Sequence, residues 1–144
     1  MIQGITFSII AGIMISLQAI FNARISEKIG LWHANSFVHG TGFILAFIVL
    51  LLLNRKINFT RINEINPLYL LGGVIGAIIV FSAMKGVSGL GASYSVTIII
   101  VTQLLITFII NIFGIFGESV INFSPIKILG LVMMISGVIL FQLR

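Results

Sequence analysis

The stretch SLQAIFNARISEKIG (residues 16–30) decides the fold, because a long apolar run ends there on charged side chains. The apolar run carries the amides Gln18 and Asn22 but no carboxylate. A helix that crosses a bilayer needs about 20 mostly apolar residues. Residues 2–23 therefore predict a membrane-spanning helix that ends just before Arg24. The two amides raise the question of what a polar face does inside lipid.

The composition of the whole chain supports a membrane protein. Of 144 residues, 59% are hydrophobic and 8% are charged, and the mean hydropathy is +1.26. Soluble domains carry about 25% charged residues, so this chain cannot coat a water-soluble fold. The first segment lacks the basic opening of a cleaved signal peptide, and we expect it to be retained as a helix. The absence of cysteine excludes disulfides and thiolate metal sites.

The chain contains five apolar segments of spanning length. They cover about residues 2–23, 34–53, 67–84, 92–113 and 125–143, joined by short links at 24–33, 54–66, 85–91 and 114–124. Lipid offers backbone groups no hydrogen-bond partner, so spanning segments form helices rather than strands. We therefore predict an all-α polytopic membrane protein with five transmembrane helices, in which residues 1–144 form a single domain.

The basic residues divide evenly between the two sides of the membrane that five spans define. Four fall on the side of the N-terminus and four on the other: Arg55, Lys56, Arg61 and Lys127 against Arg24, Lys28, Lys85 and Arg144. An excess of Lys and Arg normally sets the cytoplasmic side. We therefore expect insertion in both orientations and an antiparallel homodimer, each chain being half of an inverted-repeat transporter. The alternative is an accidental tie, with another signal fixing one orientation. The scattered basic residues form no stripe for nucleic acid.

Polar side chains share one face on each of two predicted helices. Gln18 and Asn22 lie four residues apart, so they face the same way. The fourth segment places five polar residues within a sector of roughly 120°. They are Ser93, Thr97, Gln103, Thr107 and Asn111. If the two faces meet, they line a cavity of neutral donors and acceptors, and we predict substrate contacts from Gln18, Asn22, Gln103, Thr107 and Asn111. The alternative is that the amides join helices by hydrogen bonds worth about 0.6–2 kcal/mol each.

The remaining polar and small residues allow two interpretations each. His39 is the only ionisable residue well inside a predicted span, where it either couples protons or makes a structural hydrogen bond. Lys85 either extends its amine to the interface or places a charge at the cavity mouth. Small residues predict helix-packing faces. They are Gly12, Ser16, Ala19, Gly72, Gly76, Gly130 and Gly137. No spacing points to a metal, a cofactor or enzyme chemistry.

The order of these motifs resembles the short, five-helix YdcZ-like branch of the drug/metabolite transporter superfamily. The resemblance covers nearly the whole chain, in AGIMISLQAIFNARI, NSFVHGTGFI, LLGGVIGAIIV, GLGASYSVTIIIVTQLLITFIINIFGIFG and ILGLVMMISGVIL. It implies a multi-pass exporter of the bacterial inner membrane, with relatives that occur as dual-topology chains, paired opposite-facing chains or fused copies. By motif, the amides of the family correspond to Gln18, Asn22 and Gln103. This chain departs from the family at Thr102, where Gly is usual, and at Asn111, where Asp is frequent.

Three functions remain open at this point. The first is a transporter working by alternating access on a small organic solute, neutral or weakly charged, as an antiparallel homodimer or with a paired homologous chain in the bilayer. No Asp or Glu lies within a predicted span, which argues against a carboxylate-driven cation exporter. The second is a passive ion channel formed by a dual-topology dimer. The third is an accessory subunit of a larger membrane complex.

Overall fold

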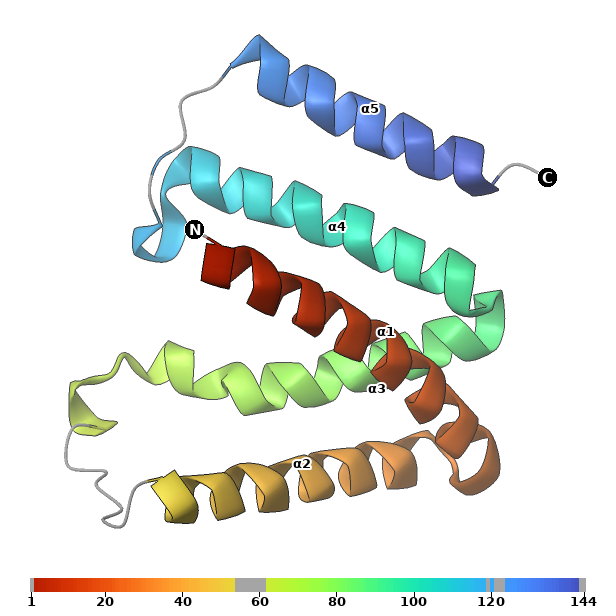
Figure 1. The fold of residues 1–144 in the computed structure, drawn as a ribbon, viewed down its shortest axis with the longest axis vertical. Coiled ribbons are helices and arrows are strands. Elements are labelled where there is room, and N and C mark those ends of the chain that lie inside the picture. The colour runs from red at the N-terminus through yellow and green to blue at the C-terminus, as the bar shows by residue number, and fades with distance from the viewer. Residues whose placement is uncertain (1, 54–61, 119, 121–123, 143–144) are drawn as a thin grey trace. The chain divides into compact units, whose positions relative to one another are not determined.

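The computed structural model describes residues 2–53, 62–118, 120 and 124–142, and within these ranges all regular structure is helical. Five long helices carry the fold (Figure 1). They are α1 (Ile2–Ile29), α2 (Leu31–Leu53), α3 (Gly72–Leu90), α4 (Ala92–Phe113) and α5 (Pro125–Gln142). Each is long and apolar enough to cross a membrane, α3 together with the short 3-10 helix η2 (Pro67–Leu71) that precedes it. The prediction of an all-α polytopic membrane protein is confirmed.

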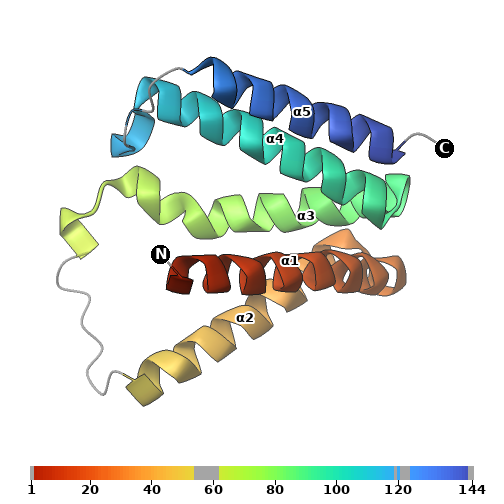
Figure 2. The same ribbon diagram turned by 45° about the horizontal axis from the view of Figure 1, so that its top comes forward.

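The helices form two compact units, Met1–Gly89 and Leu90–Arg144. The first unit holds α1, α2 and α3. Its helices α1 and α2 meet at a tight turn and diverge from it, as Figures 1 and 2 show. The second unit holds α4 and α5, which run side by side in both views (Figures 1 and 2). The prediction of one domain over residues 1–144 stays a prediction.

Helix α1 runs to Ile29, beyond the predicted end at residue 23. The apolar run ends at residue 23, but the charged turn that follows is compatible with a helix that leaves the bilayer. Arg24 and Glu27 lie one turn apart and form an ion pair with a nitrogen–oxygen distance of 3.2 Å. The helix ends only at Gly30, whose φ of +86° is a left-handed conformation that glycine adopts without strain. The predicted link at 24–33 is therefore reduced to this turn, and α2 begins at Leu31.

Helix α3 likewise runs through most of the predicted link at 85–91, which contains three glycines. Its glycines are weak helix formers, at about 1 kcal/mol each relative to alanine, but the helix continues to Leu90. The break falls at Gly91, where φ is +81°. At the other end, the side chain of Asn66 accepts a hydrogen bond of 3.0 Å from the Leu68 amide and caps η2. The helical span thus covers 67–90 rather than 67–84.

The second unit follows the predicted segments more closely. Helix α4 covers the predicted range 92–113 and ends at Gly114, whose φ is +61°. The short 3-10 helix η3 (Ile115–Gly117) lies at the start of the predicted link at 114–124. Helix α5 begins at Pro125, a favourable first-turn residue. The predicted last residue of this span, Leu143, lies outside the described residues.

Few side chains of the described residues are buried. In the first unit they gather on both sides of the α1–α2 turn, with one side chain from α3. They are Asn22, Ala23, Ser26, Ala34, Asn35 and Met84. Most large apolar side chains are exposed, with Phe7 at 71% and Leu53 at 77%. Such surfaces require lipid or another apolar surface to cover them, as expected for membrane helices.

We predict that Gly30 is required for stability because it forms the α1–α2 turn in a left-handed conformation. Gly30→Ala should lower the free energy of unfolding by about 1–2 kcal/mol, the cost of that conformation for an L-residue. Gly12→Ala is the matched control, since a Cβ at Gly12 meets nothing within 4 Å. Titration with SDS in dodecyl maltoside micelles measures both. Equal destabilisation by the two substitutions would contradict the prediction.

Candidate functional site

A groove between α1 and α2 contains two of the predicted site residues. Its volume is about 770 Å³, and its lining comes entirely from the first unit. The lining is mainly apolar, with Met14, Phe21 and Leu45 among the larger side chains. The polar groups on it are Gln18, Asn22 and Thr41. The structure therefore brings the two amides of α1 to one face and sets a hydroxyl of α2 on the same groove.

The two amides are available for hydrogen bonding. Asn22 is only 5% exposed, whereas Gln18 is exposed, and neither side chain makes a hydrogen bond within the described part of the chain. The hydroxyl of Thr41 is engaged, since it donates to the carbonyl oxygens of Phe37 and Val38, each at 3.0 Å. Within one chain, the amides of α1 thus do not join the described helices by hydrogen bonds.

The other three predicted substrate contacts lie on α4. Gln103 and Thr107 are exposed, and Asn111 is half-buried. These residues belong to the second unit, whereas Gln18 and Asn22 belong to the first. The cavity that would combine the polar faces of α1 and α4 therefore stays a prediction.

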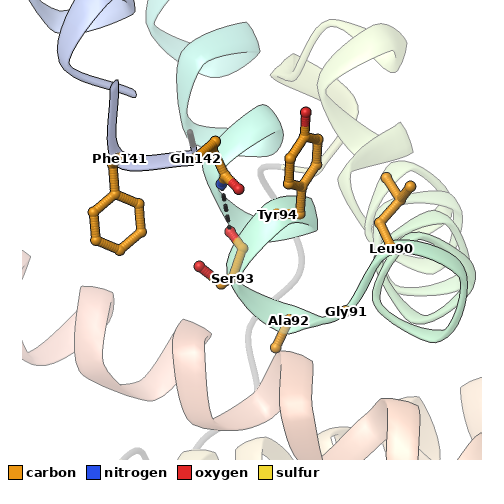
Figure 3. A pocket seen from close by; sticks show the side chains of 7 residues that line it. All are labelled: Leu90, Gly91, Ala92, Ser93, Tyr94, Phe141 and Gln142. Carbon is orange, nitrogen blue, oxygen red and sulfur yellow. Dashed lines mark hydrogen bonds between the residues drawn. The ribbon is translucent and has the colours of Figure 1, made fainter. Parts of the chain in front are cut away.

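The grooves between α4 and α5 lie along the part of α4 from Ala92 to Leu104 instead. Their volumes are about 620, 260 and 310 Å³, and their polar residues are Ser93, Tyr94, Thr97 and Gln142. Figure 3 shows the side chain of Gln142 reaching α4, where it donates to the Ser93 carbonyl oxygen at 3.5 Å. Thr97 donates to the same oxygen at 2.7 Å. Sequence reasoning missed Tyr94 and Gln142, because their proximity depends on the pairing of two helices.

His39 lies at the contact between α2 and α3 and does not line the α1–α2 groove. Its Nδ1 is 3.0 Å from the carbonyl oxygen of Asn35. Since a carbonyl only accepts, Nδ1 carries the hydrogen of this bond. Nε2 points towards α3, where it would lie 3.5 Å from a Cβ on Gly76. This hydrogen bond fits the structural interpretation of His39, and the coupling role stays a prediction.

Asn35 is the polar residue of this contact that sequence reasoning missed. It is 3% exposed, and its Nδ2 donates to the Ala77 carbonyl oxygen at 3.0 Å. Its Oδ1 is buried and receives no hydrogen bond from the described residues. The same two helices also join through the rings of Trp32 and Phe81, whose centroids lie 4.5 Å apart. A clue was the position of Asn35 four residues before His39 in NSFVHG, which puts both on one helix face.

The predicted packing residues differ in their surroundings. A Cβ on Gly76 would contact His39, whereas a Cβ on Gly12, Gly72, Gly130 or Gly137 would meet nothing within 4 Å. Ser16 donates to the carbonyl oxygen of Gly12 at 2.9 Å, and Ala19 is half-buried. Apart from Gly76, the contacts of these faces with another helix or chain stay predictions.

Charged and metal-binding groups contribute little to these sites. The side chain of Lys85 is exposed, as is that of Arg24, which is paired with Glu27. Among the residues that the structure describes, no group of three or more His, Asp or Glu side chains is placed to hold a metal ion. The polar chemistry of the candidate site is therefore that of amides and hydroxyls.

Five apolar helices with amides on their faces define a polytopic α-helical membrane protein. A family model described as "Putative inner membrane exporter, YdcZ" matches residues 3–140. The chain belongs to this family, as the order of its motifs predicted, and it is a multi-pass protein of the inner membrane. An exporter family indicates a transporter rather than an enzyme. No curated protein and no solved structure matches the chain.

We predict that a large side chain at Gly76 separates α2 from α3. Gly76→Leu should displace His39 and lower the free energy of unfolding by about 1–3 kcal/mol, the usual cost of overpacking. Gly72→Leu is the matched control, because a Cβ there meets nothing within 4 Å. SDS titration measures both variants. If Gly76→Leu is as stable as Gly72→Leu, α2 and α3 do not pack as described.

Proposed function

We propose that the protein exports a small organic solute, neutral or weakly charged, by alternating access, and that Gln18 and Asn22 contact this solute. The observation that carries the proposal is the amide of Asn22, which is 5% exposed, lines the groove and has no hydrogen-bond partner in the described part of the chain. Among the described residues the fully buried side-chain atom without a partner is Oδ1 of Asn35, so the amide atoms of Asn22 remain accessible from the groove. A polar group that faces hydrocarbon without a partner costs about 1–3 kcal/mol. A solute that hydrogen-bonds to this amide removes that cost.

The charges around the groove support a neutral or weakly charged solute. Among the residues that the structure describes, no charged side chain lines the groove. The nearest acid in the sequence, Glu27, lies in the last turns of α1 and is paired with Arg24 at 3.2 Å. A cation in the bilayer would be stabilised by an unpaired carboxylate, as cation carriers usually provide.

An antiparallel homodimer would complete the transporter in this proposal. Many transporters contain two oppositely oriented repeats with the substrate between them, and alternating access is the rocking of one repeat against the other. Here the equal tally of basic residues on the two sides supports two copies inserted in opposite directions. Gln103, Thr107 and Asn111 of α4 would then add to the amides of α1. A paired homologous chain would serve the same purpose.

We predict that export depends on the amides of both polar faces. Cells producing the wild-type chain should accumulate one or a few neutral solutes in the medium, and untargeted mass spectrometry of medium and cells detects whichever solutes these are. The double variant Gln18→Ala/Gln103→Ala should reduce accumulation about tenfold, as expected for the loss of about 1.4 kcal/mol of binding free energy.

The matched control for this experiment is Gln3→Ala, which removes an exposed amide at the start of α1. It should export like the wild type. Full export by Gln18→Ala/Gln103→Ala would contradict the proposal. Currents across a planar bilayer that do not saturate with concentration would instead support the ion channel.

We predict that the chain inserts in both orientations. Fused at the C-terminus, alkaline phosphatase reports an outer location and green fluorescent protein an inner one, and both should be active. Lys28→Ala/Lys85→Ala leaves two basic residues on that side against four on the other. This variant should place its C-terminus outside, because the side with more basic residues stays in the cytoplasm. The control variant Lys28→Arg/Lys85→Arg keeps four basic residues on each side, and both reporters should stay active. A wild-type chain with only one active reporter would contradict dual insertion.

A further inference from the structure

The α1–α2 groove has a polar part and an apolar part along its length. Helices α1 and α2 meet at the Gly30 turn, and Thr41 lies 11 residues from this glycine and Gln18 lies 12. Leu45 lies four residues farther along α2 than Thr41. With a rise of about 1.5 Å per residue, Asn22 lies about 10 Å from the end of α1 at Ile29, and Met14 lies about 12 Å farther towards the N-terminus. The amides therefore lie closer to the turn than Met14 does, and the lining of α1 from Leu17 to Ala11 is apolar.

The polar part suits a head group that both donates and accepts a hydrogen bond. An asparagine amide offers two N–H donors and a carbonyl acceptor, and those of Asn22 are unused within the described residues. Gln18 repeats this chemistry one helical turn away on the same groove. Because no charged side chain of the described ranges lines the groove, an ionised head group would find no partner among these residues. Primary amides and alcohols meet these requirements.

The apolar part suits a hydrocarbon body. Met14, Ile15 and Leu45 line it, and the groove volume of about 770 Å³ falls within the range of about 300–1,000 Å³ for small-molecule sites. A molecule with its head at Asn22 and its body along Met14 would lie parallel to the acyl chains of the bilayer. It would therefore enter the groove sideways from the lipid.

We propose that the α1–α2 groove of a single chain binds a neutral, single-chain amphiphile, with its hydrogen-bonding head at Asn22 and Gln18 and its hydrocarbon body along Met14, Ile15 and Leu45. This inference rests on the proposed export function, because it names the class of solute that the same amides would contact. It differs from binding of a phospholipid, whose charged phosphate would meet no basic residue in the described part of the lining.

Photolabelling of the full chain in phosphatidylcholine liposomes tests the inference. The probe is dodecanamide with a diazirine near the end of its chain, and mass spectrometry locates the labelled residues. We expect saturable labelling of Met14, Ile15 or Leu45 that excess unlabelled dodecanamide displaces. The same diazirine on dodecanoate or on a plain alkane should label these residues weakly and without saturation.

Variants separate the two parts of the groove. Asn22→Leu keeps a side chain of similar size without the amide and should reduce labelling about tenfold. Gln3→Leu removes an exposed amide outside the groove and should leave labelling unchanged. Leu45→Trp fills the apolar part and should reduce labelling with the amides intact. Circular dichroism and gel filtration establish that each variant is folded.

Several results would overturn the inference. Labelling spread over exposed residues such as Phe7 and Phe43, unchanged in Asn22→Leu and Leu45→Trp, would show partition into lipid only. A diazirine phosphatidylcholine that labels the groove and resists displacement by dodecanamide would show a lipid site. Export of a neutral solute without groove labelling would place the substrate elsewhere. In contrast, groove labelling with full export by Gln18→Ala/Gln103→Ala would overturn the proposed function and leave the binding site standing.

Discussion

The fold depends on the inability of hydrocarbon to form hydrogen bonds. Every backbone group inside the bilayer must find its partner within its own helix, and this requirement selects five long helices from an apolar sequence. The same constraint makes each intramembrane side-chain amide costly unless it is paired. Asn35 meets the constraint in part through the Ala77 carbonyl oxygen, whereas Asn22 has no partner within the described chain. This contrast separates an amide that joins helices from an amide that is available to a solute.

The contact between α2 and α3 and the groove between α1 and α2 use the two sides of one helix. On one side, Asn35 and His39 face Ala77 and Gly76 of α3. On the other side, Phe37, Thr41 and Leu45 line the groove with α1. The absence of a side chain at Gly76 gives the imidazole ring room against α3. Helix α2 thus holds α3 by polar and aromatic contacts and leaves its second side for the groove.

The sequence was sufficient to predict the helices but not all of their ends. Apolar length predicted 92–113 for α4, where Gly114 ends both the apolar run and the helix. The ends that apolar length predicted at residues 23 and 84 fall before the ends of the helices, because α1 and α3 continue beyond their apolar runs to Gly30 and Gly91. Hydropathy measures transfer into lipid, whereas a helix ends where the backbone turns.

The site could be predicted only as far as one helix determines it. The i, i+4 spacing placed Gln18 and Asn22 on one face, and both line the same groove. Helix α2 lies across that groove with Thr41 and Leu45, and Asn35 contacts α3. Both features depend on which helices pack together, and no local spacing encodes that choice.

The stacking of Trp32 on Phe81 has a practical consequence. Trp32 is the only tryptophan of the chain, and its ring centroid lies 4.5 Å from that of Phe81 on the neighbouring helix. Apart from the contribution of tyrosine, the intrinsic fluorescence of the protein therefore comes from a single site, the contact between α2 and α3. The wavelength and intensity of this fluorescence therefore report whether the contact between α2 and α3 opens, without any attached dye.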